Sequence, residues 1–578
     1  MKFINKLSFI ALSFMLLTAC DSTELDLLDN PNAITPDKVS INDLYNNIQL
    51  TFANVYSDAQ FGPGAAARMY HASGFTYEAN TTPNSYNGLW DASYTDLFED
   101  IETLLAITDE QGLNIHSGSA KIMKAYTLMV LVDLFGDIPF SESGQGTDII
   151  SPKLDDGSTV YSEAIKLLEE AINQLTDTNA ALPAYNNVYS SAASWITLAN
   201  TLKMRAALTT RLTNSSAAAE FKAVLDGGDF IDNAGEDFQF NTGNQRINPN
   251  SRHQFYNNHY ELGDGNYLSN YYMWKLRADK TIGDSTILID PRIRYYFYRK
   301  VDNSTNQDLT VYSCHFSEAP IPRDEVANLD FWEDIDDRLP YCVAFEDGYY
   351  GRDHLNGSGI PPDGPIRTSY GLYPGGGSFD GNSFTDTRQL GTSGGLGEGI
   401  WPIMLSSFVN FMRAEAALVM GTGEDAKEQL ELGIRASMAK VSSFESLVPT
   451  EMAAPSRPPT SANPEPPTVK EAFGMTAEDI DNYVSYVLSS YDAADDAGKL
   501  DIIITEYYLA AWGNGLEVFN SYRRTGYPGN MTPALEQQAG QFPNSFLLPN
   551  NHVDRNANVE QKTLSDRVFW DDGSANVY

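Results

Sequence analysis

Cysteine is scarce in this chain, which holds three among 578 residues: Cys20, Cys314 and Cys342. No two of them lie at CxxC spacing, so a redox or zinc motif of that type is excluded. Cys314 and Cys342 are compatible with one disulfide in an oxidising compartment, and equally with two buried thiols. The sequence leaves these two alternatives open.

Basic residues are also few. Lys and Arg total 38 against 77 Asp and Glu, which gives a formal net charge of −39. Such a chain repels polyanions, so we expect no nucleic-acid partner. The excess of carboxylates is typical of a protein that stays soluble at a crowded surface.

Patterns that carry catalysis or bind metals are missing. The seven histidines never lie at metal-ligand spacing, since His253 and His259, the closest pair, are six residues apart. There is no HExxH and no phosphate-binding GxxxxGK[ST]. Residues 391–395 match GxSxG, but their Gly, Thr and Gln neighbours provide neither the strand nor the helix of a nucleophile elbow. With 77 acidic residues, no single carboxylate pair is informative. We therefore predict no catalytic residues, no metal and no cofactor.

Long hydrophobic runs are absent except at the N-terminus, where residues 7–17 are apolar and follow Lys2 and Lys6. This stretch is too short to span a bilayer but has the length of a signal-peptide core. It ends in Leu17-Thr18-Ala19-Cys20, which resembles the lipobox of bacterial lipoproteins. We predict that residues 1–19 are a signal peptide and that Cys20 is the lipid anchor.

The predicted lipid would hold the protein on the membrane, and the segment after it would connect the lipid to the folded body. Buried acyl chains contribute about 0.8 kcal/mol per methylene group, so several chains on Cys20 hold a protein on a membrane almost permanently. Residues 20–36 are polar and acidic and include Asn30-Pro31-Asn32. We expect a flexible leader here and a single body over 37–578.

Helical periodicity dominates two blocks, about 40–227 and 403–525. Residues 122–135 are apolar on nearly all sides, which predicts a buried helix that ends at Gly136. The other segments with one apolar helical face are 161–175, 195–206, 408–420, 430–438 and 500–511. The pattern predicts a mainly α fold, a scaffold of tetratricopeptide-like hairpins resembling an α-solenoid, although no repeat of about 34 residues is visible.

The segment between the blocks, about 228–402, has a different composition. It is rich in Gly, Asn, Asp and Tyr and has few periodic stretches. Because such a length is too great for a structureless loop in a compact body, we expect a packed, loop-rich layer with little β structure. Residues 449–467 hold seven prolines and predict an exposed, extended loop.

Several motifs, in order along the chain, carry a resemblance to a known family. Besides the lipobox, they are Val132-Asp133-Leu134-Phe135-Gly136-Asp137-Ile138-Pro139-Phe140, Gly348-Tyr349-Tyr350-Gly351-Arg352-Asp353, Gly371-Leu372-Tyr373-Pro374-Gly375-Gly376-Gly377, Arg523-Arg524-Thr525-Gly526-Tyr527-Pro528 and Val568-Phe569-Trp570-Asp571. Together they resemble the SusD/RagB family of nutrient-binding outer-membrane lipoproteins of the Bacteroidetes.

The resemblance implies a helical scaffold with a loop-rich face. It implies a location at the outer membrane, facing the cell surface, and a partner, a TonB-dependent β-barrel transporter of the SusC type. The lipoprotein would capture a glycan or oligosaccharide and deliver it to the barrel. Alternatives are a peptide- or glycopeptide-binding member, a membrane-anchored surface glycoside hydrolase and a structural helical adaptor. Two helical blocks argue against most such hydrolases, which are built from many short strands.

Aromatic and polar residues that lie together outside the periodic segments are the candidate ligand contacts. A sugar presents an apolar C–H face and a rim of hydroxyl groups, so its site needs an aromatic platform with a few fixed polar groups. The residues that combine both features are Tyr77 and Tyr86 in the first block and Trp274, Tyr349, Tyr350, Arg352 and Asp353 in the central layer. We expect them to lie in exposed loops away from the core.

Two acidic positions predict structural roles. Asp137 follows a helix end and a glycine, so we expect it to accept hydrogen bonds from backbone amides rather than to bind a metal. Glu415 falls on the apolar side of a helix, where a carboxylate needs a buried partner, and Arg205 is our candidate for that partner.

Overall fold

The structure is a computed structural model that describes residues 40–177, 183, 188–261, 265–283, 286–303, 347–356, 366–387, 391–534 and 538–577. The predicted signal peptide, Cys20, Cys314 and Cys342 lie outside these ranges. Within them, none of the helices has the length and apolar character needed to cross a bilayer.

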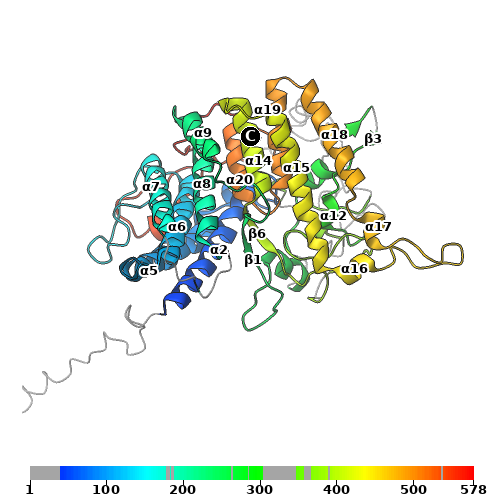
Figure 1. Ribbon diagram of the computed structural model, residues 1–578, viewed down its shortest axis with the longest axis horizontal. Coiled ribbons are helices and arrows are strands. Elements are labelled where there is room, and N and C mark those ends of the chain that lie inside the picture. The colour runs from blue at the N-terminus through cyan, green and yellow to red at the C-terminus, as the bar shows by residue number, and fades with distance from the viewer. Residues whose placement is uncertain are drawn as a thin grey trace, which may run out of the picture.

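The first block is helical, as predicted. Its longer helices are α2 (Ile41–Ala66), α5 (Phe98–Gln111), α6 (Asn114–Phe135), α7 (Gly157–Thr176), α8 (Ala192–Thr209) and α9 (Ala217–Gly227), and between α2 and α5 lie α3 (Tyr77–Asn80), η2 (Pro83–Tyr86), α4 (Asn87–Asp91) and η3 (Ala92–Leu97). Helices from α5 to α9 each pack against the next one along the chain. Figure 1 shows this block in blue and cyan on one side of the molecule.

The hairpin of α6 and α7 follows directly from its sequence. α6 is buried on nearly every side and ends at Gly136, whose φ of 79° is a backbone conformation that favours glycine. Asp137 comes next, and its Oδ1 accepts a hydrogen bond from the backbone N–H of Gly157 at 2.8 Å, at the first residue of α7. The predicted capping role of Asp137 is confirmed.

The central layer contains short elements and is closed by a pair of strands. β1 (Phe238–Asn241) pairs antiparallel with β6 (Ile400–Met404), and Phe240 lies opposite Trp401. The start and the end of the layer are therefore joined, so the layer is an insertion between the two helical blocks. Residues 391–397 form turns, with no nucleophile elbow.

Inside the layer the remaining elements are brief. They are α10 (Gln254–Tyr256), η4 (Asn257–Glu261), α11 (Asn270–Arg277), α12 (Ile293–Tyr296) and two further two-stranded sheets, β2 (Thr281–Ile282) with β3 (Thr286–Ile287) and β4 (Phe297–Tyr298) with β5 (Ser369–Tyr370). The prediction of a loop-rich layer with little β structure is confirmed.

The second block is again helical. It contains α14 (Ser406–Met420), α15 (Ala426–Ser443), η7 (Phe444–Leu447), α16 (Pro449–Ala453), α17 (Val469–Phe473), α18 (Ala477–Ala493), α19 (Asp496–Ala510) and α20 (Gly515–Thr525), and the short α21 (Asn550–Val553) follows near the C-terminus. The proline-rich segment is extended from residue 454 onward, but its first five residues form α16, because Pro449 begins that helix, where its missing N–H costs nothing. Figure 1 shows the extended part projecting between α16 and α17.

One hydrophobic core runs through both blocks and the layer. α2 packs against α20 from the far end of the chain, and α8 packs against α14. The helical blocks therefore share their interior instead of forming separate bodies.

Buried ion pairs join these elements, and one differs from our prediction. Glu415 pairs with Arg524 at 2.7 Å and with Arg211 at 3.2 Å. Arg205, our candidate partner, instead pairs with Asp133 at 2.9 Å and with Glu517 at 2.5 Å. The expectation of a buried partner for Glu415 is confirmed. The choice of Arg205 is wrong, because the guanidinium of Arg205 is already paired with the carboxylate of Asp133 on α6.

Candidate ligand-binding site

Three chain segments from distant parts of the sequence, one from the first block and two from the layer, lie side by side. An antiparallel bridge joins Tyr70 to Leu268, and a parallel bridge joins Ser269 to Arg352. The backbone of Arg352 donates to Leu268 at 2.9 Å and accepts from Asn270 at 2.9 Å. Glycine at 351 is required by this approach, since a Cβ there would lie 2.2 Å from the carbonyl oxygen of Leu268.

The loop that follows Tyr70 presents an aromatic ring to solvent. Phe75 is 51% exposed, and it is the one exposed aromatic side chain among the described residues. The loop is held from within, because Asn80 Oδ1 accepts a hydrogen bond from the backbone N–H of Ser73 at 3.1 Å. Thr76 then caps α3. Phe75 therefore stands on a fixed loop.

Next to this loop, Tyr267 is held between two guanidinium groups. The Cζ atoms of Arg352 and Arg367 each lie 3.7 Å from the centre of its ring. Two guanidinium groups this close to one centroid must cover opposite faces of the ring. Arg352 Nη2 also donates to the Tyr267 hydroxyl at 2.6 Å. Both cations are thereby fixed in place.

His71 links the loop to this stack, which we call the Tyr267 cluster: His71, Tyr267, Arg352 and Arg367. Its ring centre lies 5.8 Å from that of Tyr267 in an edge-on arrangement. Burial, helped by the charge of Arg352, lowers the pKa of His71 to about 3, so its imidazole is neutral at neutral pH. The cations of the cluster are therefore its two arginines. Phe75 and the Tyr267 cluster together form our candidate site.

The structure brings four of the predicted ligand contacts to this site: Tyr77, Tyr350, Arg352 and Asp353. Arg352 belongs to the cluster, and Asp353, the next residue, accepts a hydrogen bond from Asn270 Nδ2 at 3.2 Å. Tyr77 lies beneath the loop, where its hydroxyl accepts from Arg68 Nη2 at 2.9 Å and lies 3.1 Å from His354 Nε2. Asp353 and Tyr77 therefore support the site from within.

Three other predicted contacts, Tyr86, Trp274 and Tyr349, lie elsewhere. Tyr86 packs edge-on against Phe135, 5.3 Å between centres, and Trp274 stacks on Tyr271 at 6.2 Å. Tyr349 lies under the guanidinium of Arg299 at 4.9 Å. Tyr350, by contrast, belongs to the site, because it packs with Ile366 in a small cluster that Tyr267 also contacts.

All seven predicted side chains are buried, with exposed fractions of 3–6%. Our expectation of exposed loops away from the core is wrong, since Tyr77, Tyr86, Trp274 and Tyr349 belong to the main core. The reason is that other segments cover them: Phe542 packs on Tyr77, Phe135 on Tyr86 and the guanidinium of Arg299 on Tyr349. Their role in ligand binding stays a prediction.

Sequence reasoning missed Phe75, His71 and Arg367. A lone phenylalanine in a polar stretch, between Gly74 and Thr76, was the available signal for Phe75. No sequence signal pointed to the pairing of Arg352 with Arg367 around Tyr267. Among the described residues there is also no group of three His, Cys, Asp or Glu side chains arranged to hold a metal ion.

Two family models match the chain. One, described as "Starch-binding associating with outer membrane", matches residues 31–317. The other, described as "Susd and RagB outer membrane lipoprotein", matches residues 398–567. Together they span well over half of the sequence, so the chain belongs to the SusD/RagB family of outer-membrane lipoproteins. No curated protein matched the sequence.

Solved structures show the same fold. A SusD/RagB family protein from Bacteroides thetaiotaomicron has a TM-score of 0.64 at 17% identity, over 93% of this chain and all (100%) of the other. A chitin-binding SusD homologue from Flavobacterium johnsoniae has a TM-score of 0.58 at 18% identity, over 93% and 100% of the two chains. A SusD homologue from Bacteroides fragilis has a TM-score of 0.61 at 16% identity, over 92% and 99%. At these identities the likeness establishes the fold.

Membership of the family settles the class of protein. The protein is a nutrient-binding lipoprotein of the outer membrane, and the family consists of binding proteins rather than enzymes. The predictions of family, fold class, outer-membrane location and a non-enzymatic role are confirmed.

Proposed function

We propose that the protein captures a glycan or oligosaccharide on the face formed by Phe75 and the Tyr267 cluster. The observation that carries this proposal is a 51% exposed aromatic ring on a fixed loop whose His71 packs against Tyr267, the ring held between two guanidinium groups. An exposed ring covers the C–H face of a sugar, and fixed polar groups at its edge bind hydroxyl groups.

The previously predicted contacts take two roles in this proposal. Arg352 and Asp353 contact the ligand or orient the groups that do. Tyr77 and Tyr350 are buried and support the face from below, whereas Tyr86, Trp274 and Tyr349 pack in the core away from it. Relatives support a saccharide as the ligand, because one matching family model is described as starch-binding and one similar structure is that of a chitin-binding protein.

We further propose that the captured ligand passes to a TonB-dependent β-barrel transporter in the same membrane. Family membership supports such a partner in general terms. The predicted lipid on Cys20 would keep the body at the membrane surface where that barrel opens.

Replacing Phe75 with Ala tests the site. Loss of one stacked ring should weaken glycan binding by about 1–3 kcal/mol, by analogy with the truncation of interface anchors. The free energy of unfolding should change by less than about 0.5 kcal/mol, because the ring is largely exposed. The measurement is calorimetric titration with neutral oligosaccharides, including chito-oligosaccharides and starch fragments, together with melting temperatures.

Leu432→Ala is the matched control, because Leu432 is 42% exposed on α15, a helix outside the layer. It should change neither affinity nor stability. Arg352→Lys keeps the charge but loses the planar stack on Tyr267, so it should also weaken binding. Unchanged affinity in both Phe75→Ala and Arg352→Lys would contradict the assignment, and preferential binding of peptides would favour the peptide-binding alternative.

A further inference from the structure

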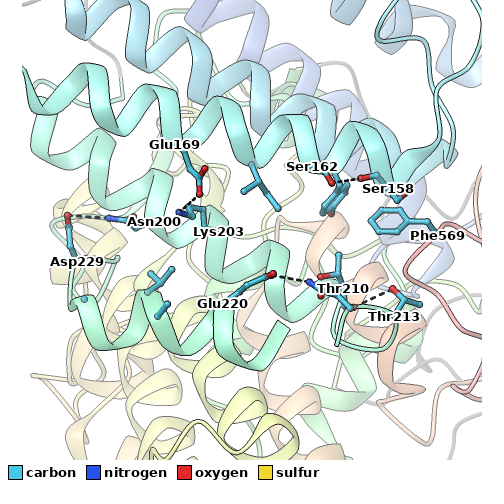
Figure 2. Close-up of a pocket in the computed structure, with 16 residues that line it drawn as sticks. Ser158, Ser162, Glu169, Asn200, Lys203, Thr210, Thr213, Glu220, Asp229 and Phe569 are labelled. Atoms are coloured by element: carbon cyan, nitrogen blue, oxygen red, sulfur yellow. Dashed lines mark hydrogen bonds and ion pairs between the residues drawn. The ribbon is translucent and has the colours of Figure 1, made fainter. Parts of the chain in front are cut away.

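A concave surface that shares no residue with this face lies on the first helical block. It is a groove of about 900 Å³ lined by α7, α8, α9, the turn after α8 and the C-terminal segment. α8 packs against both α7 and α9. On α7, Ser158, Ser162, Ile165 and Glu169 follow one another along the helix as one stripe that faces the groove (Figure 2).

An aromatic ring stands at one end of this groove. Phe569 is half-buried and lies edge-on to Tyr161, with 5.1 Å between ring centres. It is set close to α7 because residue 157 is a glycine, where a Cβ would lie 3.3 Å from Phe569 Cδ1. Figure 2 shows Phe569 beside Ser158 and Ser162.

The position of Phe569 is fixed by the buried residues on either side of it. The carboxylate of Asp133 accepts from the Tyr161 hydroxyl at 2.6 Å and from Trp570 Nε1 at 2.9 Å. Trp570 is fully buried, so the neighbouring Phe569 is held at the rim of the groove. In the C-terminal motif, Trp570 is thus a core residue, and its neighbour Phe569 presents a ring at the surface.

The walls of the groove are polar and preorganised. Lys203 Nζ donates to Glu169 at 3.0 Å, which joins α8 to α7. At the other end Asp229 accepts from Thr197 Oγ1 at 2.6 Å and from Asn200 Nδ2 at 3.4 Å. Fixed hydroxyl, amide and carboxylate groups beside one aromatic ring are the chemistry that a sugar requires.

The charges that line the groove select among sugars. Three carboxylates, on Glu169, Glu220 and Asp229, face one ammonium group, on Lys203. An anionic saccharide would be repelled, whereas neutral hydroxyl groups and amino groups would find acceptors. The volume is near the upper end of the roughly 300–1,000 Å³ typical of small-molecule sites, which is room for several sugar rings.

We propose that this groove is a second saccharide-binding site, separate from the Phe75 face, and that it takes an extended oligosaccharide that is neutral or carries amino groups. Phe569 stacks on one ring, and the polar walls bind hydroxyl groups of the others. This goes beyond the proposed function, since it adds a site on the helical scaffold. A protein interface is the less fitting use, because such interfaces centre on large apolar side chains. Ten of the sixteen residues that line this groove are instead Ser, Thr, Asn, Asp, Glu or Lys.

Three diazirine-tagged hexaoses of different charge test the proposal: maltohexaose (neutral), the glucosamine hexamer (cationic) and the galacturonate hexamer (anionic). The protein with Cys20→Ala is cross-linked to each, and the modified peptides are identified by mass spectrometry. The expected result is modification of α7, α9 or the segment around Phe569 by the neutral and cationic probes, and none there by the anionic probe.

Ala223→Trp fills the groove from α9 and should lower modification there at least tenfold. Ala218→Trp, an exposed position on the same helix that does not line the groove, is the matched control and should change nothing. Phe569→Ala should also lower the modification of the groove. If Phe569→Ala fails to fold, Ala223→Trp still decides the question.

The outcomes separate this inference from the proposed function. Cross-links confined to the Phe75 face, and lost in Phe75→Ala, would overturn the second site while the proposed function stands. Equal modification of the groove by the anionic probe would also overturn it. The second site would also be overturned if Ala223→Trp no longer co-purified with the transporter while its saccharide cross-links stayed unchanged. Absence of cross-links at both places would contradict both proposals.

Discussion

At the scale of single residues, the layer uses its aromatic side chains mainly as core. Tyr77 and Trp274 were expected in exposed loops, yet both are buried. Sequence periodicity separates helices from loops, but it does not show whether a loop packs onto a scaffold. Burial of a loop residue is decided by contacts with distant segments, as with Tyr77 and His354. The exposed ring of Phe75 could be recognised only once those contacts were known.

Three buried histidines and the half-buried His71 give a prediction at the same scale. Burial lowers the pKa of His71, His253 and His259 to about 3, with help from nearby cations at His71 and His259, and lowers that of His354 well below its ordinary value. Their pKa in the unfolded chain is about 6.5, so between these values the unfolded state alone binds the proton. Stability is therefore lost as the pH falls below about 6.5, by roughly 1.4 kcal/mol per pH unit for each histidine.

Glu451 acts in the opposite direction, because burial raises its pKa to about 7 and the folded state then binds the proton first. The contribution of one histidine is therefore measured by comparing the pH dependence of the free energy of unfolding between a variant and the unchanged chain. Urea unfolding at several pH values between 4.5 and 6.5 should give a slope about one proton smaller for His259→Gln than for the unchanged chain. Equal slopes would mean that His259 is protonated in the folded protein.

At the scale of elements, the helices could be predicted and their partners could not. The end of α6 at Gly136 and the end of α14 at Gly421 follow from apolar runs that stop at a glycine. The pairing of β1 with β6 joins residues more than 150 positions apart, and four- and five-residue strands carry little periodic signal. The partner of Glu415 was misassigned for the same reason, since Arg524 lies on α20, in a different part of the chain.

The cap at the start of α7 gives a prediction with an internal control. Asp137 accepts a hydrogen bond from the Gly157 N–H, whereas Asp156, the residue before the helix, makes no capping bond with its side chain. Asp137→Ala should therefore lower the free energy of unfolding by about 1 kcal/mol. Asp156→Ala should lower it much less. Chemical denaturation of both variants is the measurement, and equal losses would show that Asp137 does not act through this bond.

At the scale of the whole molecule, the helical scaffold and the inserted layer present two faces with different chemistry. One carries Phe75 and the two arginines around Tyr267, and the other carries Phe569 with three carboxylates. The scaffold and the existence of the layer could be predicted from the sequence. Neither the Phe75 face nor the groove could be predicted, because each is assembled from segments that meet only in the folded chain.

The predicted anchor is tested by Cys20→Ala. This variant should fold normally but leave the membrane fraction and lose labelling by a fatty-acid probe, because the acyl chains are the expected attachment. Fractionation and probe labelling measure this, with Cys20 intact as the reference. Full membrane retention of the variant together with undiminished labelling would show that another residue carries the anchor.

The most direct test of glycan capture is hydrogen–deuterium exchange of the whole protein with and without a saturating oligosaccharide that it binds. We predict slower exchange in the peptides that contain Phe75, Tyr267 and Arg352, and loss of this protection in Phe75→Ala but not in Leu432→Ala. If the exchange rates of those peptides stay the same while the oligosaccharide is bound, the assignment of ligand capture to this face is contradicted.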